Sequence, residues 1–501
     1  MSSLKLYPSF EQFKQMAESS VNVIPVFCQI LSDNLTPVSA YARVAGQSSH
    51  SFLLESVVGG EKIARYSFLS CDPITIFEAR GNQIRIIEKG QERKIENPDP
   101  LKVMEEILAP YRPAHLPGLP RFLGGLVGYA SYDMVRYYEH LPNVPNDDRN
   151  LPDLAFGLYP NMVIFDHVSK TIKVVSNAFV ENDPREAYDQ AARRIEDLVS
   201  RLAYPMDFPP AQIDPLAEPR LNFTSNFKRE DFEKAVDRCK EYIFAGDIFQ
   251  VVLSQRLAAK TSADPFNIYR ALRVVNPSPF MFHLKTPACT LVGSSPEIMC
   301  RVEDGIITNR PLAGTRRRGK TEAEDKELEA DLLADPKERA EHIMLVDLGR
   351  NDVGKVAELA SVKVTEEMKV ERYSHVMHIS SNVQGKLAGG KTAFDALRAT
   401  LPVGTVSGAP KVRAMQIIDE FEPTKRGPYA GAVGYVDFSG NMDTCIALRT
   451  LILQGDTAYV QVGAGIVADS VPASEYQETI NKAKGQLKAI EIAEGFAPIN
   501  K

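Results

Sequence analysis

The 501-residue sequence predicts an α+β fold, because helical segments and antiparallel strands are mixed along the chain instead of alternating strictly. The clearest strand pair covers residues 431–438 and 444–453, which flank a turn at residues 439–441. Ser225 is the expected cap of an amphipathic helix that ends at Gly246, and an apolar strand follows at once. No repeat of fixed period is present.

Residues 1–204 form the first expected region, which is rich in strands. Residues 52–58 and 83–88 have alternating apolar side chains and are bounded by glycine-containing turns, which predicts antiparallel pairs. Apolar residues recur at helical spacing in residues 101–108 and 186–202. This region therefore combines antiparallel strands with helices.

Five prolines then lie between residues 205 and 219. Proline neither continues a helix nor donates to a strand ladder, so this segment marks a boundary in the chain. We expect a linker over residues 205–221 and a second region over residues 222–495.

The composition is that of a globular protein, with 44% hydrophobic and 25% charged residues. A net charge of −7 argues against a general nucleic-acid binder. The chain has no basic, apolar leader at its start and no apolar run of membrane length, so we expect a cytoplasmic protein with no membrane partner. The six cysteines lack metal-binding spacing and are expected to be reduced, and tryptophan is absent.

Two glycine motifs imitate nucleotide-binding loops. Residues 385–392 match the phosphate-loop pattern, and Asp437 is a possible downstream magnesium ligand. Asp437 lies in the expected hairpin, however, whereas nucleotide-binding cores need parallel strands. Residues 463–468 imitate a dinucleotide fingerprint, yet too little chain follows to build the required βαβ unit. We expect neither nucleotide site, although the second turn can present N–H groups to an anion.

A glycine and several arginines share one short stretch, residues 308–319, after an alternating strand. Gly314 would let an anionic ligand lie against bare backbone N–H groups, and arginines nearby could clamp a carboxylate. The alternative is a solvated basic loop that answers the acidic run following it.

Two pairs of acidic residues lie at expected helix starts. Glu338 and Glu341 follow the cap Asp335, and Glu475 and Glu478 have the same spacing near the end of the chain. Acids are common in first turns, so each pair alone is ordinary. Together they offer oxygen ligands that would suit Mg²⁺ with open positions for substrate.

Three further residues suit a site for an anionic ring. Arg449 interrupts an apolar strand and needs either an internal ion-pair partner or a substrate carboxylate. His378 could transfer protons, although a lone histidine in a strand is more often a core residue. Thr405 lies in a glycine-containing loop that allows close approach of a ligand.

The chain resembles the chorismate-utilising enzyme family. The resemblance is dense over residues 225–490 and implies large, mixed, mainly antiparallel sheets packed as a sandwich with helices outside. It rests on GDIFQ (246–250), SSPE (294–297), PLAGT (311–315), residues 338–352, residues 403–416 and GAG (463–465).

The resemblance also implies the roles of individual residues. Glu341, Glu478 and Glu475 would bind Mg²⁺, and His378, Glu338 and Thr405 would be catalytic. The residues expected to bind substrate are Gly314, Thr315, Tyr429, Arg449, Gly463, Ala464 and Gly465.

The implied activity is the Mg²⁺-dependent conversion of chorismate and ammonia to anthranilate and pyruvate, the first step of tryptophan biosynthesis. Relatives with other products place a lysine where this chain has Ala313, whose methyl group leaves room for ammonia. The alternative product is 4-amino-4-deoxychorismate. The chain lacks a cysteine nucleophile in a glycine-rich elbow, so we expect a glutamine amidotransferase subunit as partner.

The first region adds an expectation of feedback inhibition by tryptophan. LLES (53–56) and NPSPFMF (276–282) resemble the family's tryptophan-binding segments. A non-catalytic tryptophan-sensing subunit is the second alternative, which the acidic pairs and Arg449 argue against. The residues expected to contact tryptophan are Glu55, Ser56, Pro279, Phe280 and Met281.

Overall fold

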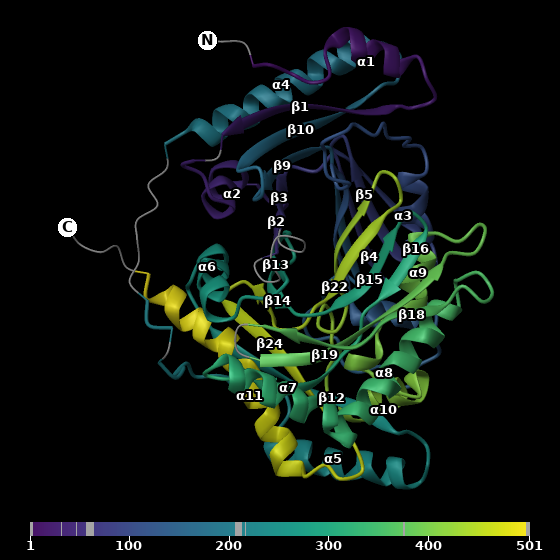
Figure 1. The fold of residues 1–501 in the computed structure, drawn as a ribbon, viewed down its shortest axis with the longest axis vertical. Helices are drawn as coiled ribbons and strands as arrows, with labels where there is room; N and C mark the ends of the chain where they lie inside the picture. Colours follow the sequence, from purple (N-terminus) through teal and green to yellow (C-terminus); the bar gives the residue numbers. More distant parts are fainter. Residues whose placement is uncertain are drawn as a thin grey trace.

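The structure is a computed structural model, and it describes residues 4–31, 33–46, 48–56, 65–205, 213–215, 217–373 and 376–496. Two antiparallel sheets face each other and helices cover their outer faces, which confirms the predicted α+β class (Figure 1). In the described residues each sheet has 12 strands.

The first sheet has the strand order β1-β10-β9-β3-β2-β13-β14-β23-β24-β12-β11, with β20 also paired to β12. Its strands are β1 (Val23–Leu31), β2 (Ser51–Glu55), β3 (Tyr66–Cys71), β9 (Asn161–Asp166), β10 (Thr171–Phe179), β11 (Thr224–Ser225), β12 (Gln250–Lys260), β13 (Phe280–Lys285), β14 (Thr290–Ser295), β20 (Gly408–Ala409), β23 (Thr450–Gln454) and β24 (Thr457–Ile466).

The second sheet has the order β17-β19-β16-β15-β22-β21-β7-β8-β4-β5-β6, with β18 paired to β19. Its strands are β4 (Thr75–Arg80), β5 (Gln83–Glu88), β6 (Gln91–Glu96), β7 (Gly125–Ala130), β8 (Leu154–Tyr159), β15 (Ile298–Glu303), β16 (Ile306–Asn309), β17 (Leu312–Arg317), β18 (Lys363–Arg372), β19 (Val376–Lys386), β21 (Ala432–Asp437) and β22 (Met442–Ile446).

The helices lie outside this pair of sheets. They are α1 (Phe10–Ala17), α2 (Pro37–Ala45), α3 (Pro100–Leu108), α4 (Pro184–Ala203), α5 (Arg229–Phe244), α6 (Pro265–Val275), α7 (Glu322–Ala334), α8 (Pro336–Gly354), α9 (Ala393–Thr400), α10 (Lys411–Phe421) and α11 (Pro472–Glu494), with 3₁₀ turns η1 (Tyr132–Tyr137) and η2 (Gly404–Val406). Figure 1 shows α1 and α4 at the β1 end of the first sheet and α5, α10 and α11 at the opposite end.

The core has one layer between the sheets and one layer beneath each outer face. Phe52 and Phe282 of the first sheet meet Val433 and Cys445 of the second in the central layer. The outer layer of the first sheet is packed by α1, α2, α4, α6 and α11, and that of the second by α3 and α9. Burying apolar side chains on both faces of each sheet is the main source of stability.

Strands from both predicted regions enter both sheets. β2 pairs with β13 in the first sheet, and β7 pairs with β21 in the second. The regional boundaries stay a prediction, and residues 206–212 and 216 of the linker lie outside the described residues.

Four local predictions are wrong in detail. Ser225 lies in β11, and the cap of α5 is Lys228. Residues 444–453 form β22 and β23, which belong to different sheets. Residues 463–465 lie within β24, and the expected turn around Gly314 lies in β17, where the register shifts between Ala313 and Arg316.

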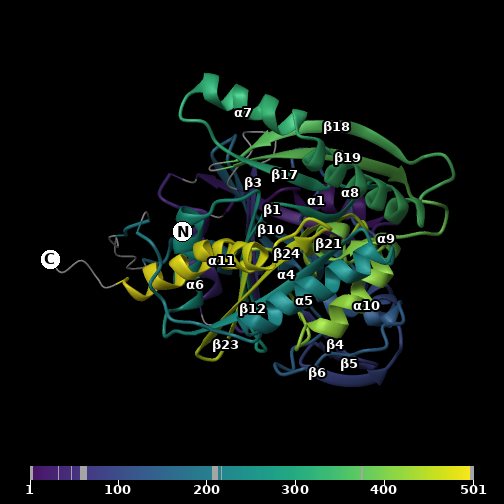
Figure 2. The ribbon, with the colours of Figure 1, turned by 90° about the horizontal axis from the view of Figure 1, so that it is seen from below.

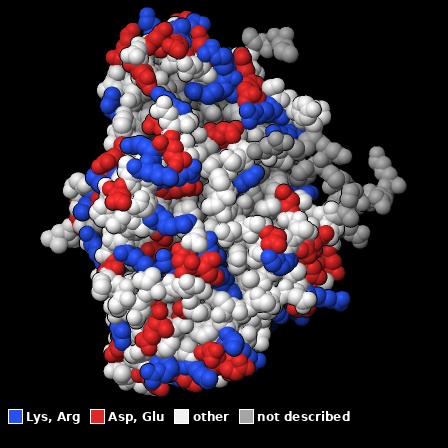
Figure 3. Space-filling view, turned by 180° about the vertical axis from the view of Figure 1, so that it is seen from behind, with Lys and Arg blue, Asp and Glu red and all other residues white. Residues whose placement is uncertain are grey.

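Surface charge is mixed. Figure 3 shows basic and acidic side chains interspersed over the face seen from behind. Figure 2 shows α7 and the β18–β19 pair on one side of the molecule and β4 to β6 on the other.

No helix among the described residues is both long and apolar enough to cross a membrane, and the predicted location stays a prediction.

Candidate active site

The chain crosses between the two sheets twice at one place. It leaves β14 and enters β15 through Glu297, and it leaves β22 and enters β23 through Arg449. The Ile446 backbone N–H donates to the Glu297 carbonyl oxygen at 3.0 Å, so the two crossings lie side by side. Glu297 and Arg449 both lie in the short connections between these strands, outside the regular strand ladders.

Arg449 has a strained backbone and an unpaired guanidinium. Its φ of 49° is in the left-handed region that residues with a Cβ rarely adopt. The side chain is half-buried, and burial lowers its pKa from the ordinary value. In the described part of the chain no hydrogen bond or ion pair to its guanidinium is found, which favours a substrate carboxylate over an internal partner.

Glu297 is a buried carboxyl group beside Arg449's crossing. Thr405 Oγ1 donates to its Oε1 at 2.8 Å, and the Leu312 N–H donates to the same oxygen at 3.3 Å. Burial penalises the carboxylate and raises the pKa to about 8, so Glu297 holds a proton at neutral pH. Glu297 was missed as a functional residue from sequence, although an acid directly after a buried strand is a signal that could have found it.

His378 is held by the bulge around Gly314. Its Nδ1 lies 2.8 Å from the Gly314 carbonyl oxygen and 3.1 Å from Thr315 Oγ1. A carbonyl only accepts, so Nδ1 carries the proton and Nε2 keeps a lone pair. Burial lowers the pKa of His378, which keeps the imidazole neutral.

Gly314 brings β17 against the start of α8. It has a φ of 69°, and a Cβ at this position would lie 3.2 Å from Glu338 Oε2 and 3.0 Å from a Leu332 methyl carbon. Arg316, two residues on, donates to Glu338 Oε1 at 3.1 Å. Glycine is therefore required both by the backbone and by the space.

The other arginines of this stretch have acidic partners. Arg317 contacts Glu324 and Arg318 contacts Asp325, both on α7. The alternative, a basic segment that pairs with the acidic run after it, therefore holds for Arg317 and Arg318. Gly314 and Thr315 instead contact His378.

The two acidic helix starts converge. Burial raises the pKa of Glu341, and the Glu338 charge adds to this effect. Burial likewise raises the pKa of Glu475, with a further contribution from Glu478. The charge of Lys337 on α8 acts on carboxyl groups of both helices, Glu341 and Glu475.

Lys482 joins α11 to the glycine-rich part of β24. Its Nζ lies 2.6 Å from Glu478 Oε1 and donates to the Gly463 carbonyl oxygen at 3.0 Å. Its charge also acts on Glu341, so residues 341 and 478 share a neighbour. Lys482 was missed from sequence, although it lies one helical turn after Glu478.

Gln250 and Tyr429 close the floor of the site beneath β24. A Cβ on Gly465 would lie 2.6 Å from Gln250 Nε2, and a Cβ on Gly463 would lie 2.9 Å from the Tyr429 oxygen. The Gln250 side chain also acts on Glu341, where it lowers the carboxyl pKa against the larger effect of burial. Gln250 was missed from sequence. Ala464, between the two glycines, is fully buried in the core, and substrate contact by Tyr429, Gly463, Ala464 and Gly465 stays a prediction.

The acidic groups can be tested as a magnesium site. Among the described residues no group of three or more acids, histidines or cysteines is closed around a common point. The carboxyl pKa values of Glu341 and Glu475 are raised by burial and by a neighbouring acid on the same helix, an effect that a hard cation would relieve. Mg²⁺ commonly takes one or two carboxylates and completes its shell with water and substrate, so the donor set fits.

A cavity between the sheets brings together all five residues expected to contact tryptophan. It is also lined by Leu54, Phe68, Phe282, Arg301, Val433, Gly434, Tyr435, Asp443 and Cys445. Ser56 Oγ is buried without a hydrogen-bond partner among the described residues. The Glu55 carboxylate accepts from Tyr269 Oη at 2.5 Å and pairs with Arg273, both on α6.

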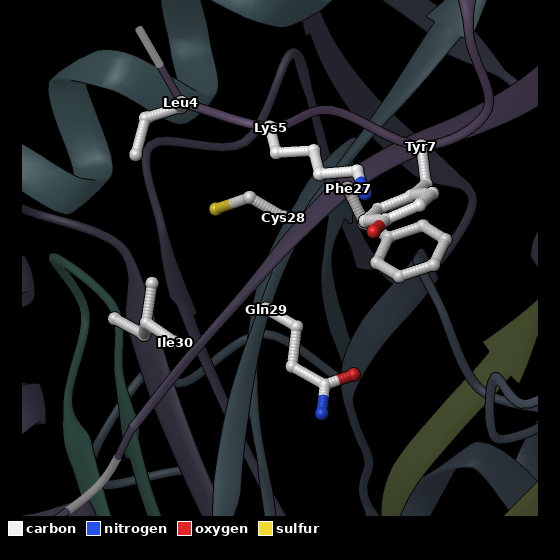
Figure 4. Close-up of a pocket in the computed structure, with 7 residues that line it drawn as sticks. All are labelled: Leu4, Lys5, Tyr7, Phe27, Cys28, Gln29 and Ile30. Atoms are coloured by element: carbon white, nitrogen blue, oxygen red, sulfur yellow. The ribbon is translucent and has the colours of Figure 1, made fainter. Parts of the chain in front are cut away.

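A further hollow lies beside β1, the strand at one end of the first sheet (Figure 4). Its ionisable groups are the Lys5 amine, which lies over the Tyr7 ring, the Tyr7 phenol and the Cys28 thiol, whose pKa burial raises to about 11. It contains no carboxylate, so it offers none of the chemistry gathered around Arg449.

Comparison with known proteins identifies the family. Residues 50–488 match the family model described as chorismate binding enzyme. The chain is 50% identical to "Anthranilate synthase component 1" of Acetivibrio thermocellus over 97% of this chain and 99% of that protein. The same values hold for the protein of that name from Pseudomonas aeruginosa.

Solved structures agree as well. Anthranilate synthase component I from Streptococcus pneumoniae has a TM-score of 0.76 at 40% identity, covering 91% of this chain and 99% of that one. The menaquinone-specific isochorismate synthase from Escherichia coli shares the fold, with a TM-score of 0.69 at 18% identity over 96% of this chain and 99% of that one. This chain belongs to the family of chorismate binding enzymes.

Proposed function

We propose that the chain converts chorismate and ammonia to anthranilate and pyruvate, with Mg²⁺ bound at the acidic helix starts. The observation that supports the proposal is a chain of shared neighbours: the charges of Arg449 and Lys482 both act on neutral His378, and the Lys482 charge also acts on Glu341 and Glu475. The crossing at protonated Glu297 lies beside the crossing that carries Arg449. Such a site can hold a dianionic ring substrate and move protons on it.

The two carboxylates of chorismate would bind at different ends of the site. Glu341, Glu475 and Glu478 would hold Mg²⁺, which supplies charge neutralisation for the ring carboxylate. The guanidinium of Arg449 and the backbone N–H groups of the Gly463–Gly465 stretch would bind the carboxylate of the enolpyruvyl group. Tyr429 supports this stretch from below.

Three steps would follow on the bound ring. Ammonia attacks a ring carbon as the 4-hydroxyl leaves, and Glu297 gives its proton to the departing oxygen, which leaves as water. The added ammonium loses a proton to water to give the amine. His378 Nε2 then takes a ring proton as the ring C–O bond breaks, and the ring becomes aromatic. The enolpyruvyl group leaves as the enolate of pyruvate, which takes a proton from water at its methylene carbon to give pyruvate.

Ala313 and the six cysteines support free ammonia as the nucleophile, supplied by another subunit. Ala313 is buried beside Gly314 and its methyl group cannot compete with ammonia as a nucleophile. All six cysteines are buried, and none is placed to hydrolyse glutamine. Ammonia would therefore come from a glutamine amidotransferase subunit that assembles with this chain.

Tryptophan would inhibit the enzyme from the cavity between the sheets. Phe280 and Phe282 offer aromatic contact, and the unpartnered hydroxyl of Ser56 offers a polar contact to an amino acid. Such a cavity combines an apolar lining with a few polar groups, which suits a small aromatic ligand.

The test is the product formed from chorismate, Mg²⁺ and ammonium salt. The proposal expects the blue fluorescence of anthranilate, its loss on adding EDTA, and its absence in a Glu341→Gln variant that keeps its fold. Accumulation of 4-amino-4-deoxychorismate instead would refute the assigned product.

A further inference from the structure

Ser294 makes one hydrogen bond to Arg449 of the proposed substrate site and another to Asn276, at the end of the helix that borders the proposed tryptophan cavity. It is fully buried in β14, two residues before the crossing at Pro296 and Glu297. Its backbone N–H donates to the Arg449 carbonyl oxygen at 3.2 Å. Its hydroxyl donates to the carbonyl oxygen of Asn276, which caps the C-terminus of α6.

Arg449 needs such support because its backbone conformation is strained. A left-handed arginine costs free energy and persists only where its surroundings hold it. The Leu448 N–H donates to the Ile446 carbonyl at 2.7 Å, and Thr450 Oγ1 donates to the Leu448 carbonyl at 2.9 Å. Ser294 supplies the hydrogen bond to the Arg449 carbonyl oxygen, which helps to hold the strained conformation.

The cavity reaches Ser294 by two short connections. In the first, Phe280 and Met281 line the cavity and lie opposite Ser295 and Ser294 in the β13–β14 pair.

The second connection runs through α6. Glu55 lines the cavity, and its carboxylate is bound by Tyr269 and Arg273. Arg273 lies one turn before Asn276, whose carbonyl accepts from Ser294.

We propose that Ser294 is a positioning residue that holds Arg449 for its substrate carboxylate and transmits occupancy of the cavity to it. A ligand that displaces the Asn276 to Phe280 segment moves Ser294 and lets Arg449 relax, which weakens chorismate binding. The inference rests on the proposed function, in that Arg449 binds a chorismate carboxylate and the cavity binds tryptophan.

The experiment measures binding, not turnover. Chorismate is titrated calorimetrically into the protein with Mg²⁺ and without any ammonia source, in the absence and presence of saturating tryptophan. Coupling of two sites changes affinity by about 5- to 150-fold. We expect tryptophan to weaken chorismate binding at least about 5-fold in the unchanged protein, and less than about 2-fold in Ser294→Ala.

Ser51→Ala is the matched control. Ser51 is also fully buried in the first sheet, and its hydroxyl lies 2.7 Å from Tyr41 Oη with no bond to α6 or Arg449. This control should keep the full tryptophan effect. Ser294→Cys, which keeps the volume but donates weakly, should lie between Ser294→Ala and the unchanged protein.

The outcomes separate the two proposals. An unchanged tryptophan effect in Ser294→Ala, an equal loss in Ser51→Ala, or no tryptophan effect in the unchanged protein would each overturn the role of Ser294. Anthranilate production by the unchanged protein would stand in all three cases. A protein that neither binds nor consumes chorismate would overturn the proposed function and this inference together.

Discussion

The buried carboxyl of Glu297 gives the sharpest prediction, because its protonation affects both stability and catalysis. Its pKa rises from an ordinary 4.5 to about 8 on folding. A group whose pKa is higher in the folded state contributes stability that is fully present below pH 4.5 and is lost as the pH rises through 8. The whole window corresponds to about 5 kcal/mol at about 1.36 kcal/mol per pH unit.

Replacement by the neutral isostere removes this dependence. We expect the free energy of unfolding of the unchanged, ligand-free protein to fall by about 3 to 4 kcal/mol between pH 5 and pH 8 through this one group. Glu297→Gln should lose that part of the fall, measured by urea unfolding at several pH values. Glu358→Gln, which alters a carboxylate at the surface beside Lys386, should run parallel to the unchanged protein.

Catalysis provides the second readout. An amide cannot give a proton to the leaving hydroxyl, so kcat of Glu297→Gln should fall by about 10²- to 10⁴-fold. The unchanged enzyme should lose activity above pH 8 as Glu297 ionises. If the free energy of unfolding had the same pH dependence in Glu297→Gln and in the unchanged protein, or if the variant kept its activity, Glu297 would not be a buried, protonated catalytic acid.

Three other changes test the rest of the site. Glu341→Gln should abolish turnover and leave tryptophan affinity within about 2-fold by calorimetry, since the acid is remote from the cavity lining; loss of both would contradict separate sites. Ser56→Phe should fill the cavity and relieve tryptophan inhibition with little change in kcat, and an unshifted inhibition curve would exclude the cavity. Gly314→Ala should destabilise the protein by about 1 to 3 kcal/mol in urea unfolding, because its φ of 69° suits glycine and a Cβ would press on Glu338; a variant as stable as the unchanged protein would contradict the strain.

Local patterns predicted the elements that local forces decide. The hairpin around residues 439–441 and the helix start at Asp335 follow from turn and capping chemistry within a few residues, and both are confirmed. The convergence of the Glu341 and Glu475 helices came from the family resemblance, since no spacing within either helix reveals its neighbour.

Features that depend on distant chain escaped the sequence reasoning. The chain passes from one sheet to the other at Arg449, and the apolar sequence around it does not reveal this change. The residues on both sides form strands, β22 and β23, and only their partner strands differ. Glycine favours turns and therefore predicts a turn at Gly463–Gly465, but pairing of this stretch with β12 overrides that preference. The role of Glu297 required its burial, which the sequence does not display.

The pairing of β2 with β13 has a consequence for synthesis on the ribosome. When residues 1–204 have emerged, β2 lacks the partner that covers one of its edges, and β7 lacks β21. The edge of β2 stays open until β13 (Phe280–Lys285) has been translated, and the edge of β7 stays open until β21 (Ala432–Asp437), more than 200 residues beyond residue 204. The nascent chain therefore passes through a long interval of exposed backbone, and a chaperone that shields strand edges should raise the yield of folded enzyme more than one that binds helices.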